Sequence, residues 1–197
     1  MTTPSPAILA TLADHSRQAL TVVPSGRRSA ASLAAWEIRA GVWRQVFAAQ
    51  AVAGRGGFVP PAAKREGDGA TPAGIYPLGL VFGYAAAAPT AMPYRQITAA
   101  DHWVDDPASS QYNTWVHGDP QAASWEDMLR PDGLYRYGIV VEYNTAPVIP
   151  GKGSAIFIHL WRGPDEATSG CIALAEADLV RLIAWLSPTD NPVIVLG

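Results

Sequence analysis

The stretch AIFIHLWRGPDEATSGCIAL, residues 155–174, carries the clearest structural and chemical signals of the chain. Its apolar start ends at His159, which predicts a buried strand closed by a histidine. Twelve residues after that histidine comes Cys171, the single cysteine of the protein, preceded by Thr168-Ser169-Gly170. We expect these residues to form a loop that leads into a helix.

Cys171 has two interpretations. A free cysteine is commonly a small buried hydrophobe, and His159 is by itself equally compatible with a satisfied core histidine. Alternatively, the cysteine is a nucleophile and the histidine is its base, provided that the fold brings them together. Gly170 lets a substrate approach the backbone closely. The N–H groups of Gly170 and Cys171, next to the short polar Ser169, are then candidates for an oxyanion hole.

These residues resemble the signature of the L,D-transpeptidase (YkuD-type) catalytic domain, which has a histidine at a strand end, a loop and a Ser-x-Gly-Cys-like motif. A second stretch, KREGDGATPAGIY at 64–76, resembles the Thr-Pro segment that precedes a core strand in that family. The resemblance covers about residues 18–197. It implies one mainly β domain over 18–197, sandwich-like or barrel-like, with one main C-terminal helix and a few short helices. Residues 1–17 would be an N-terminal extension.

The chain departs from the family pattern at four positions. Thr168 stands where the family usually has serine, and Ser169 replaces a histidine or arginine. Leu160 replaces a glycine or serine, which is acceptable if that position orients the imidazole through its backbone carbonyl. Ala173 replaces an arginine suited to binding a carboxylate or to shaping the loop. We therefore interpret the chain as a divergent branch of the family.

The resemblance implies acyl transfer on peptidoglycan stem peptides. Cys171 would attack an amide carbonyl of the donor, and His159 would protonate the leaving amine. An amine acceptor or water would then resolve the thioester. Two alternatives stay open: the same cysteine chemistry as a carboxypeptidase, an amidase or an acyltransferase on another polymer, and a non-catalytic module that binds peptide or glycan.

Further residues are candidates for substrate contact. Trp161 and Arg162 begin the loop that runs to the cysteine, although packing and solvation explain them equally well. Arg65 and Asp68 either line the cleft or pair with each other. Aromatic side chains in the middle of the chain would form a lid or, as we favour, pack in the core: Trp103, Trp115, Trp125, Tyr84, Tyr94 and Tyr112.

Composition excludes several classes of protein. The chain has 197 residues, 49% hydrophobic and 16% charged, which is typical of a folded domain. Its net charge of −3 argues against nucleic acid as a partner. No apolar stretch reaches the roughly 18–20 residues of a membrane span. The spacing of His102 and His117 matches no standard zinc motif, and we expect neither a metal nor a cofactor.

Localisation is left open by the N-terminus. Residues 1–6 lack a basic region, so the sequence predicts no secretory signal there. The resemblance, in contrast, implies the cell envelope, in the periplasm or outside the cell. The alternative location is the cytoplasm.

The pattern of apolar and turn residues predicts the following elements. We expect strands at 19–23, 31–39, 42–53, 75–82, 96–104, 137–143, 154–160 and 192–196, with 107–124 irregular. We expect helices at 7–17, from Ser124 to Leu129 through a capping box, and at 175–186. The last helix has one apolar face, and we interpret it as structural. The alternative is a functional role, in which its N-terminus lies near Cys171 and lowers the pKa of the thiol.

Overall fold

The computed structural model describes residues 6–26 and 29–197. Residues 1–5, part of the predicted extension and of the segment searched for a signal, lie outside them. The strands are β1 Gln18–Pro24, β2 Ala30–Arg39, β3 Val42–Val52, β4 Phe58–Val59, β5 Thr71–Pro72, β6 Gly74–Gly83, β7 Tyr94–Gln96, β8 Asp101–Val104, β9 Trp115–His117, β10 Trp125–Asp127, β11 Tyr137–Val141, β12 Phe157–Leu160, β13 Ile172–Leu174 and β14 Val193–Leu196. The helices are α1 Pro6–Leu12, α2 Glu176–Trp185 and the 3-10 turn η1 Pro188–Asp190.

The main sheet closes on itself. Its nine strands run in the order β11-β12-β13-β3-β2-β1-β14-β6-β7, and β6 also pairs with β11. This extra pairing makes the sheet barrel-like and removes most of its free edges. The chain is therefore mainly β with few helices, as the sequence predicts. The hairpin predicted around Gly41 is confirmed, because β2 and β3 pair antiparallel along their whole length.

Helix α2 packs into the interior of the barrel. Its fully buried side chains, Leu179, Leu182 and Ile183, join the largest hydrophobic cluster together with residues of most barrel strands. The three-and-four spacing of these residues places them on one helix face. Their burial confirms the apolar face that the sequence predicts for this helix.

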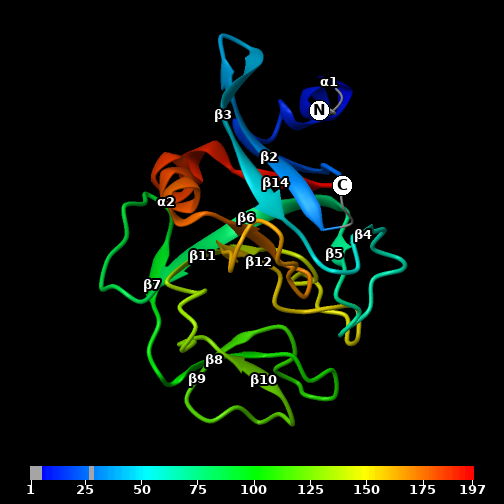
Figure 1. Ribbon diagram of the computed structural model, residues 1–197, viewed down its shortest axis with the longest axis vertical. Coiled ribbons are helices and arrows are strands. Elements are labelled where there is room, and N and C mark those ends of the chain that lie inside the picture. The colour runs from blue at the N-terminus through cyan, green and yellow to red at the C-terminus, as the bar shows by residue number, and fades with distance from the viewer. Residues whose placement is uncertain (1–5, 27–28) are drawn as a thin grey trace.

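A second hydrophobic cluster lies on the outer face of the barrel. It joins Phe82 of β6, Phe157 of β12 and Trp103 of β8 with Tyr135 and Cys171. The rings meet edge to face, with Trp103 and Phe157 centroids 4.9 Å apart. Figure 1 shows the three-stranded sheet of β8, β9 and β10 as a separate layer beyond the barrel. This cluster therefore fixes the small sheet against the face of β12 on which the site lies.

Helix α1 covers another part of the barrel. Leu9 and Leu12 are buried against Ala19 of β1 and Val195 of β14. The helix ends at Leu12 rather than at residue 17, because turns follow and the Ser16 N–H bonds back to the Leu12 carbonyl. The extension over 1–17 as a separate unit stays a prediction.

The helix predicted from Ser124 to Leu129 is wrong. Residues 125–127 form β10, which pairs antiparallel with β8, with Glu126 opposite Trp103. The capping-box pattern is a local signal worth about 1 kcal/mol. Cross-strand pairing and burial outweigh it here. The same sheet contains β9, in a segment predicted to be irregular.

Two predicted strands are shorter than expected. The strand expected over 96–104 is split into β7 and β8, because the Asp101 carboxylate accepts from the Thr98 N–H and closes a turn. The strand expected over 154–160 begins only at Phe157. Ala155 has a φ of 52° and Gly153 a φ of 102°, and such left-handed residues cannot continue a β ladder. The strand β13 between Cys171 and α2 was not predicted.

Candidate active site

Strand alternation brings His159 and Cys171 to the same side of the barrel wall. Strands β12 and β13 pair in parallel, with Ile158 opposite Ile172 and His159 opposite Ala173. Ile158 and Ile172 point into the barrel core, whereas Phe157 and Cys171 belong to the outer cluster. Side chains two residues apart share a face. His159 and Cys171 therefore both project outward, on neighbouring strands.

Both side chains line one cavity of about 120 Å³. The wall is formed by the strands β10, β12 and β13, the loop between β10 and β11, and the loop between β12 and β13. Its lining side chains include Glu126, Arg130, Tyr135, His159, Trp161, Arg162, Glu166, Cys171 and Ala173. Among the described residues, no hydrogen bond joins the imidazole of His159 to the thiol. The structure thus brings the two predicted residues to one cavity without a direct bond.

The thiol of Cys171 is held in a neutral state. Its Sγ accepts the Phe157 N–H at 3.3 Å and donates to the Ala155 carbonyl at 3.2 Å. Only 8% of the residue is exposed. Burial raises the pKa of the thiol to about 12, and the negative charge of Glu126 adds to the rise. The expectation that α2 lowers this pKa is wrong, because β13 separates the helix from the cysteine.

His159 is a neutral imidazole with a defined tautomer. Its Nδ1 lies 2.7 Å from the Leu160 carbonyl oxygen, which can only accept, so Nδ1 carries the proton. The lone pair therefore remains on Nε2. Burial lowers the pKa of the imidazole to about 4. This contact meets the condition under which leucine is acceptable at position 160.

The loop before Cys171 is fixed by the Thr-Pro segment. The Thr71 hydroxyl donates to the Gly170 carbonyl at 2.8 Å and accepts the Gly54 N–H at 2.9 Å. Gly170 has a φ of +141°, and a Cβ there would lie 2.9 Å from the Ala70 carbonyl oxygen. The two stretches that carry the family resemblance are therefore in direct contact.

The predicted oxyanion donors differ in availability. The Gly170 N–H donates to Thr168 Oγ1 at 3.1 Å, so it is engaged within its own loop. No acceptor is bonded to the Cys171 N–H in the part of the chain that the structure describes. The hydroxyl of Ser169 accepts from Arg55 Nη1 at 2.8 Å, in an exposed contact. The backbone N–H of Cys171 is thus the better candidate.

Arg65 and Asp68 do not line the cavity. The Asp68 carboxylate accepts from Lys64 Nζ at 2.7 Å and from the Arg65 backbone N–H at 2.8 Å. The Arg65 guanidinium donates to the carbonyls of Ala62 and Lys64. Both side chains therefore stabilise the Thr-Pro loop through bonds within that loop. Of the two interpretations, local pairing describes them better, although Asp68 bonds the backbone N–H of Arg65 and not its guanidinium.

Trp161 and Arg162 do line the cavity. Arg162 Nη2 donates to Asp132 Oδ2 at 2.8 Å, and the same carboxylate accepts two bonds from Arg130, at 3.0 and 2.7 Å. Asp132 therefore holds two guanidinium groups at the wall that Ala173 also forms. Arginine thus enters this cavity from positions other than 173.

Three lining side chains were missed by the sequence analysis. Tyr135 donates its hydroxyl to Glu126 Oε2, and its ring meets His159 edge to face at 5.3 Å. Arg130 lies over the same tyrosine ring at 5.1 Å. Glu126 lay inside a predicted helix, and nothing in the spacing of the other two marks them as site residues. Only the pairing of β10 with β8 brings them together.

The two histidines of the small sheet lie beside separate carboxylates. His102 Nδ1 lies 2.9 Å from Asp127, and His117 Nδ1 lies 3.1 Å from Asp101. Within residues 6–26 and 29–197 there is no group of three or more metal-binding side chains. Trp103 and Tyr112 are buried in the core, whereas Trp125 is exposed.

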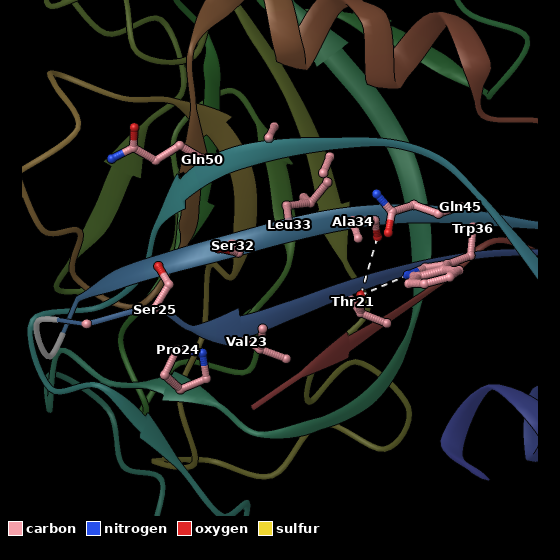
Figure 2. A pocket seen from close by; sticks show the side chains of 13 residues that line it. Thr21, Val23, Pro24, Ser25, Ser32, Leu33, Ala34, Trp36, Gln45 and Gln50 are labelled. Atoms are coloured by element: carbon pink, nitrogen blue, oxygen red, sulfur yellow. Dashed lines mark hydrogen bonds between the residues drawn. The ribbon is translucent and has the colours of Figure 1, made fainter. Parts of the chain in front are cut away.

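A larger groove lies elsewhere, on the outer face of β1, β2 and β3. It has a volume of about 800 Å³, and Figure 2 shows Trp36 and Thr21 on its wall, joined by a hydrogen bond of 3.0 Å. None of the described residues that line it is charged. The hydroxyl groups of Thr21, Ser25 and Ser32 therefore have no acid or base beside them among the described lining residues, and the groove offers no activated nucleophile.

Comparison with known families identifies the domain. The model of the YkuD L,D-transpeptidase catalytic domain matches residues 28–195. The fold and the Cys–His cavity place the protein among barrel-like domains with a cysteine and a histidine on adjacent strands. The chain belongs to the L,D-transpeptidase catalytic domain family. No curated protein matches it. In the described part of the chain, no helix is both long and apolar enough to cross a membrane.

Thr71→Val is expected to destabilise the domain by roughly 2–4 kcal/mol. Valine keeps the shape of threonine but leaves the Gly54 N–H and the Gly170 carbonyl without a partner, and each buried orphan group costs about 1–3 kcal/mol. Urea unfolding measures the loss. Thr71→Ser keeps the hydroxyl and should lose about 1 kcal/mol or less. Equal losses in both variants would show that the hydroxyl does not hold the loop.

Proposed function

We propose that the protein is a cysteine acyltransferase that acts on peptidoglycan stem peptides through a thioester on Cys171, with His159 as the base. The observation that carries the proposal is the common cavity of these two side chains, His159 on β12 and Cys171 directly before the adjacent parallel strand β13. Family membership supports the reaction class and the peptide substrate. It also supports action in the cell envelope, where peptidoglycan is found.

The resting charges favour base catalysis over a preformed ion pair. Because the pKa of the thiol is raised to about 12 and that of His159 is lowered to about 4, both groups are neutral at neutral pH. Sulfur attack on the donor carbonyl would then pass the thiol proton to His159 Nε2. Collapse of the tetrahedral intermediate breaks the C–N bond, and His159 returns the proton to the leaving amine.

The developing oxyanion needs a donor close to the sulfur. The backbone N–H of Cys171 is suited to this role, since it lies just before β13 and donates to no acceptor within the described residues. One such donor is worth about 10²–10³ in rate. An amine would resolve the thioester by transpeptidation, and water would resolve it by carboxypeptidase action.

One observation favours a second candidate, the non-catalytic peptide- or glycan-binding module. The thiol is buried, hydrogen-bonded on both sides and has a raised pKa, which is also the description of an inert structural cysteine. The two candidates differ in whether the sulfur can be acylated.

Intact-mass spectrometry with a stem tetrapeptide donor tests the proposal. We expect the wild type to gain the mass of the donor acyl group without its terminal D-alanine, and we expect Cys171→Ala to gain nothing. Digestion should locate the adduct on Cys171. An unmodified wild type that is nonetheless alkylated by iodoacetamide would exclude this donor but keep the nucleophile. A thiol that resists both reagents would establish the binding module.

A further inference from the structure

One carboxyl group in the cavity has no ion pair. Glu126 of β10 lines the wall together with His159 and Cys171. Its Oε2 accepts the hydroxyl of Tyr135. Within the described residues, Oε1 accepts no hydrogen bond, and no cation lies within salt-bridge distance of the group.

The nearest guanidinium groups are already engaged. Arg130 forms a two-bond pair with Asp132, and Arg162 donates to the same carboxylate. Arg130 also stacks on the ring of Tyr135, which holds it in place. The arginines therefore act on Glu126 only across a distance.

The surroundings disfavour the charged form of Glu126. Burial raises its pKa, and the charges of Asp105 and Glu66 raise it further, whereas the bond from Tyr135 and the charge of Arg130 lower it without restoring the ordinary value. The negative charge of Glu126 also raises the pKa of the Cys171 thiol. A buried carboxylate of this kind is stabilised strongly by a cation that reaches it.

We propose that Glu126 binds the ammonium group of the amine acceptor beside the Cys171 thioester, and that it thereby directs the acyl group to amines rather than to water. The inference rests on the proposed function and adds the residue that selects the acceptor. The ligand class is a primary alkylammonium ion. The observation behind it is a carboxylate without an ion pair, on the wall that the reactive sulfur shares.

The step balances with the groups present. The bound ammonium ion passes one proton to His159 Nε2, and its freed lone pair attacks the thioester carbonyl. The C–N bond forms as the C–S bond breaks. The sulfur takes up the electron pair and recovers the proton from His159, and the second proton that the nitrogen loses on becoming an amide passes to His159 and from there to water. Glu126 neither gains nor loses a proton in these steps, so it acts by holding the acceptor.

The test measures how the acyl-enzyme is divided between an amine and water. The wild type and Glu126→Gln are acylated with the stem tetrapeptide, and Nα-acetyl-lysine amide, a cation at neutral pH, is added as acceptor. We expect the ratio of amide product to hydrolysis product to fall about 10- to 100-fold in Glu126→Gln, the size of a lost charge-assisted hydrogen bond. Attack by hydroxylamine, which is mostly uncharged at neutral pH, should change less than threefold.

Two variants serve as controls. Glu126→Asp keeps the charge and should retain most of the preference for the lysine derivative. Asp119→Asn removes an exposed carboxylate that does not line this cavity and should leave the ratio unchanged. Glutamine at 126 still offers an oxygen to Tyr135, and thermal melts verify the fold of each variant.

The outcomes separate this inference from the proposed function. A wild type that forms no acyl-enzyme overturns the proposed function, and this inference falls with it. An acyl-enzyme whose product ratio is the same in the wild type and Glu126→Gln overturns the role of Glu126 alone. A second measurement needs no variant. The wild type should favour the lysine derivative over hydroxylamine at least tenfold more than a free cysteine thioester does, and an equal preference contradicts the inference.

Discussion

His159→Asn is expected to slow acylation of Cys171 by about 10²–10⁴, the usual contribution of a positioned general base. The asparagine amide can donate to the Leu160 carbonyl in place of Nδ1, so the buried hydrogen bond is kept. No group then remains at Nε2 to take the thiol proton. Since burial raises the pKa of that thiol to about 12, the uncatalysed supply of thiolate at neutral pH is very small.

Time-resolved intact-mass spectrometry with the tetrapeptide donor measures this rate. The alkylation rate of Cys171 by iodoacetamide is the control, because it reports whether the thiol is still reachable. An acylation rate within threefold of the wild type would remove His159 from the mechanism. A parallel loss of alkylation would point instead to a collapsed cavity.

The pH dependence of the wild type is a second test of the role of His159. Because the pKa of folded His159 is lowered to about 4, acylation should stay constant down to that region and fall below it. The free energy of unfolding depends on pH in a different range. The unfolded histidine binds a proton near pH 6.5 and the folded one does not, so stability is lost as pH falls from about 6.5 to about 4, by about 3 kcal/mol. Urea unfolding of His159→Asn should lack this share of the loss.

Patterns with a clear period predicted the fold well. The buried apolar run of β12, the hairpin of β2 and β3 and the apolar face of α2 all follow from the local pattern of residues. The elements within 94–127 were not predicted well. Their strands are three or four residues long and exist only through pairing, β7 with β6 and the other three with one another. A capping-box signal at Ser124 was stronger locally than any strand signal there.

The site residues also divide into those that the sequence predicts and those that only the fold reveals. His159, Cys171, Trp161 and Arg162 were within reach of the sequence, since they lie in or beside one motif and line one cavity. Glu126 and Tyr135 enter that cavity from the small sheet and the loop before β11. Their distance from the motif in sequence leaves no periodic signal, so only the fold places them there. Arg65 and Asp68 belong to the Thr-Pro segment that contacts the Cys171 loop, but their side chains lie outside the cavity and stabilise the segment itself.

Gly54→Ala is expected to cost at least about 3 kcal/mol of stability and to reduce acylation by about 10². A Cβ on Gly54 would lie 2.3 Å from the Gly69 carbonyl oxygen and 3.0 Å from both the Gly170 Cα and the Thr71 backbone nitrogen. All three neighbours are backbone atoms, so no side-chain rotation relieves the clash. The loop that carries Cys171 and the Thr-Pro segment must then move apart.

The matched control for this substitution is Gly163→Ala, in the loop between β12 and β13. There the nearest atom to a new Cβ is the Glu166 carboxylate at 3.9 Å, and the backbone conformation is not left-handed. Stability should change by less than about 1 kcal/mol. Urea unfolding and the acylation rate together measure both variants. If Gly54→Ala is as stable and as active as Gly163→Ala, then the contact between the two motif segments does not position Cys171, and the loop must be held by β13 alone.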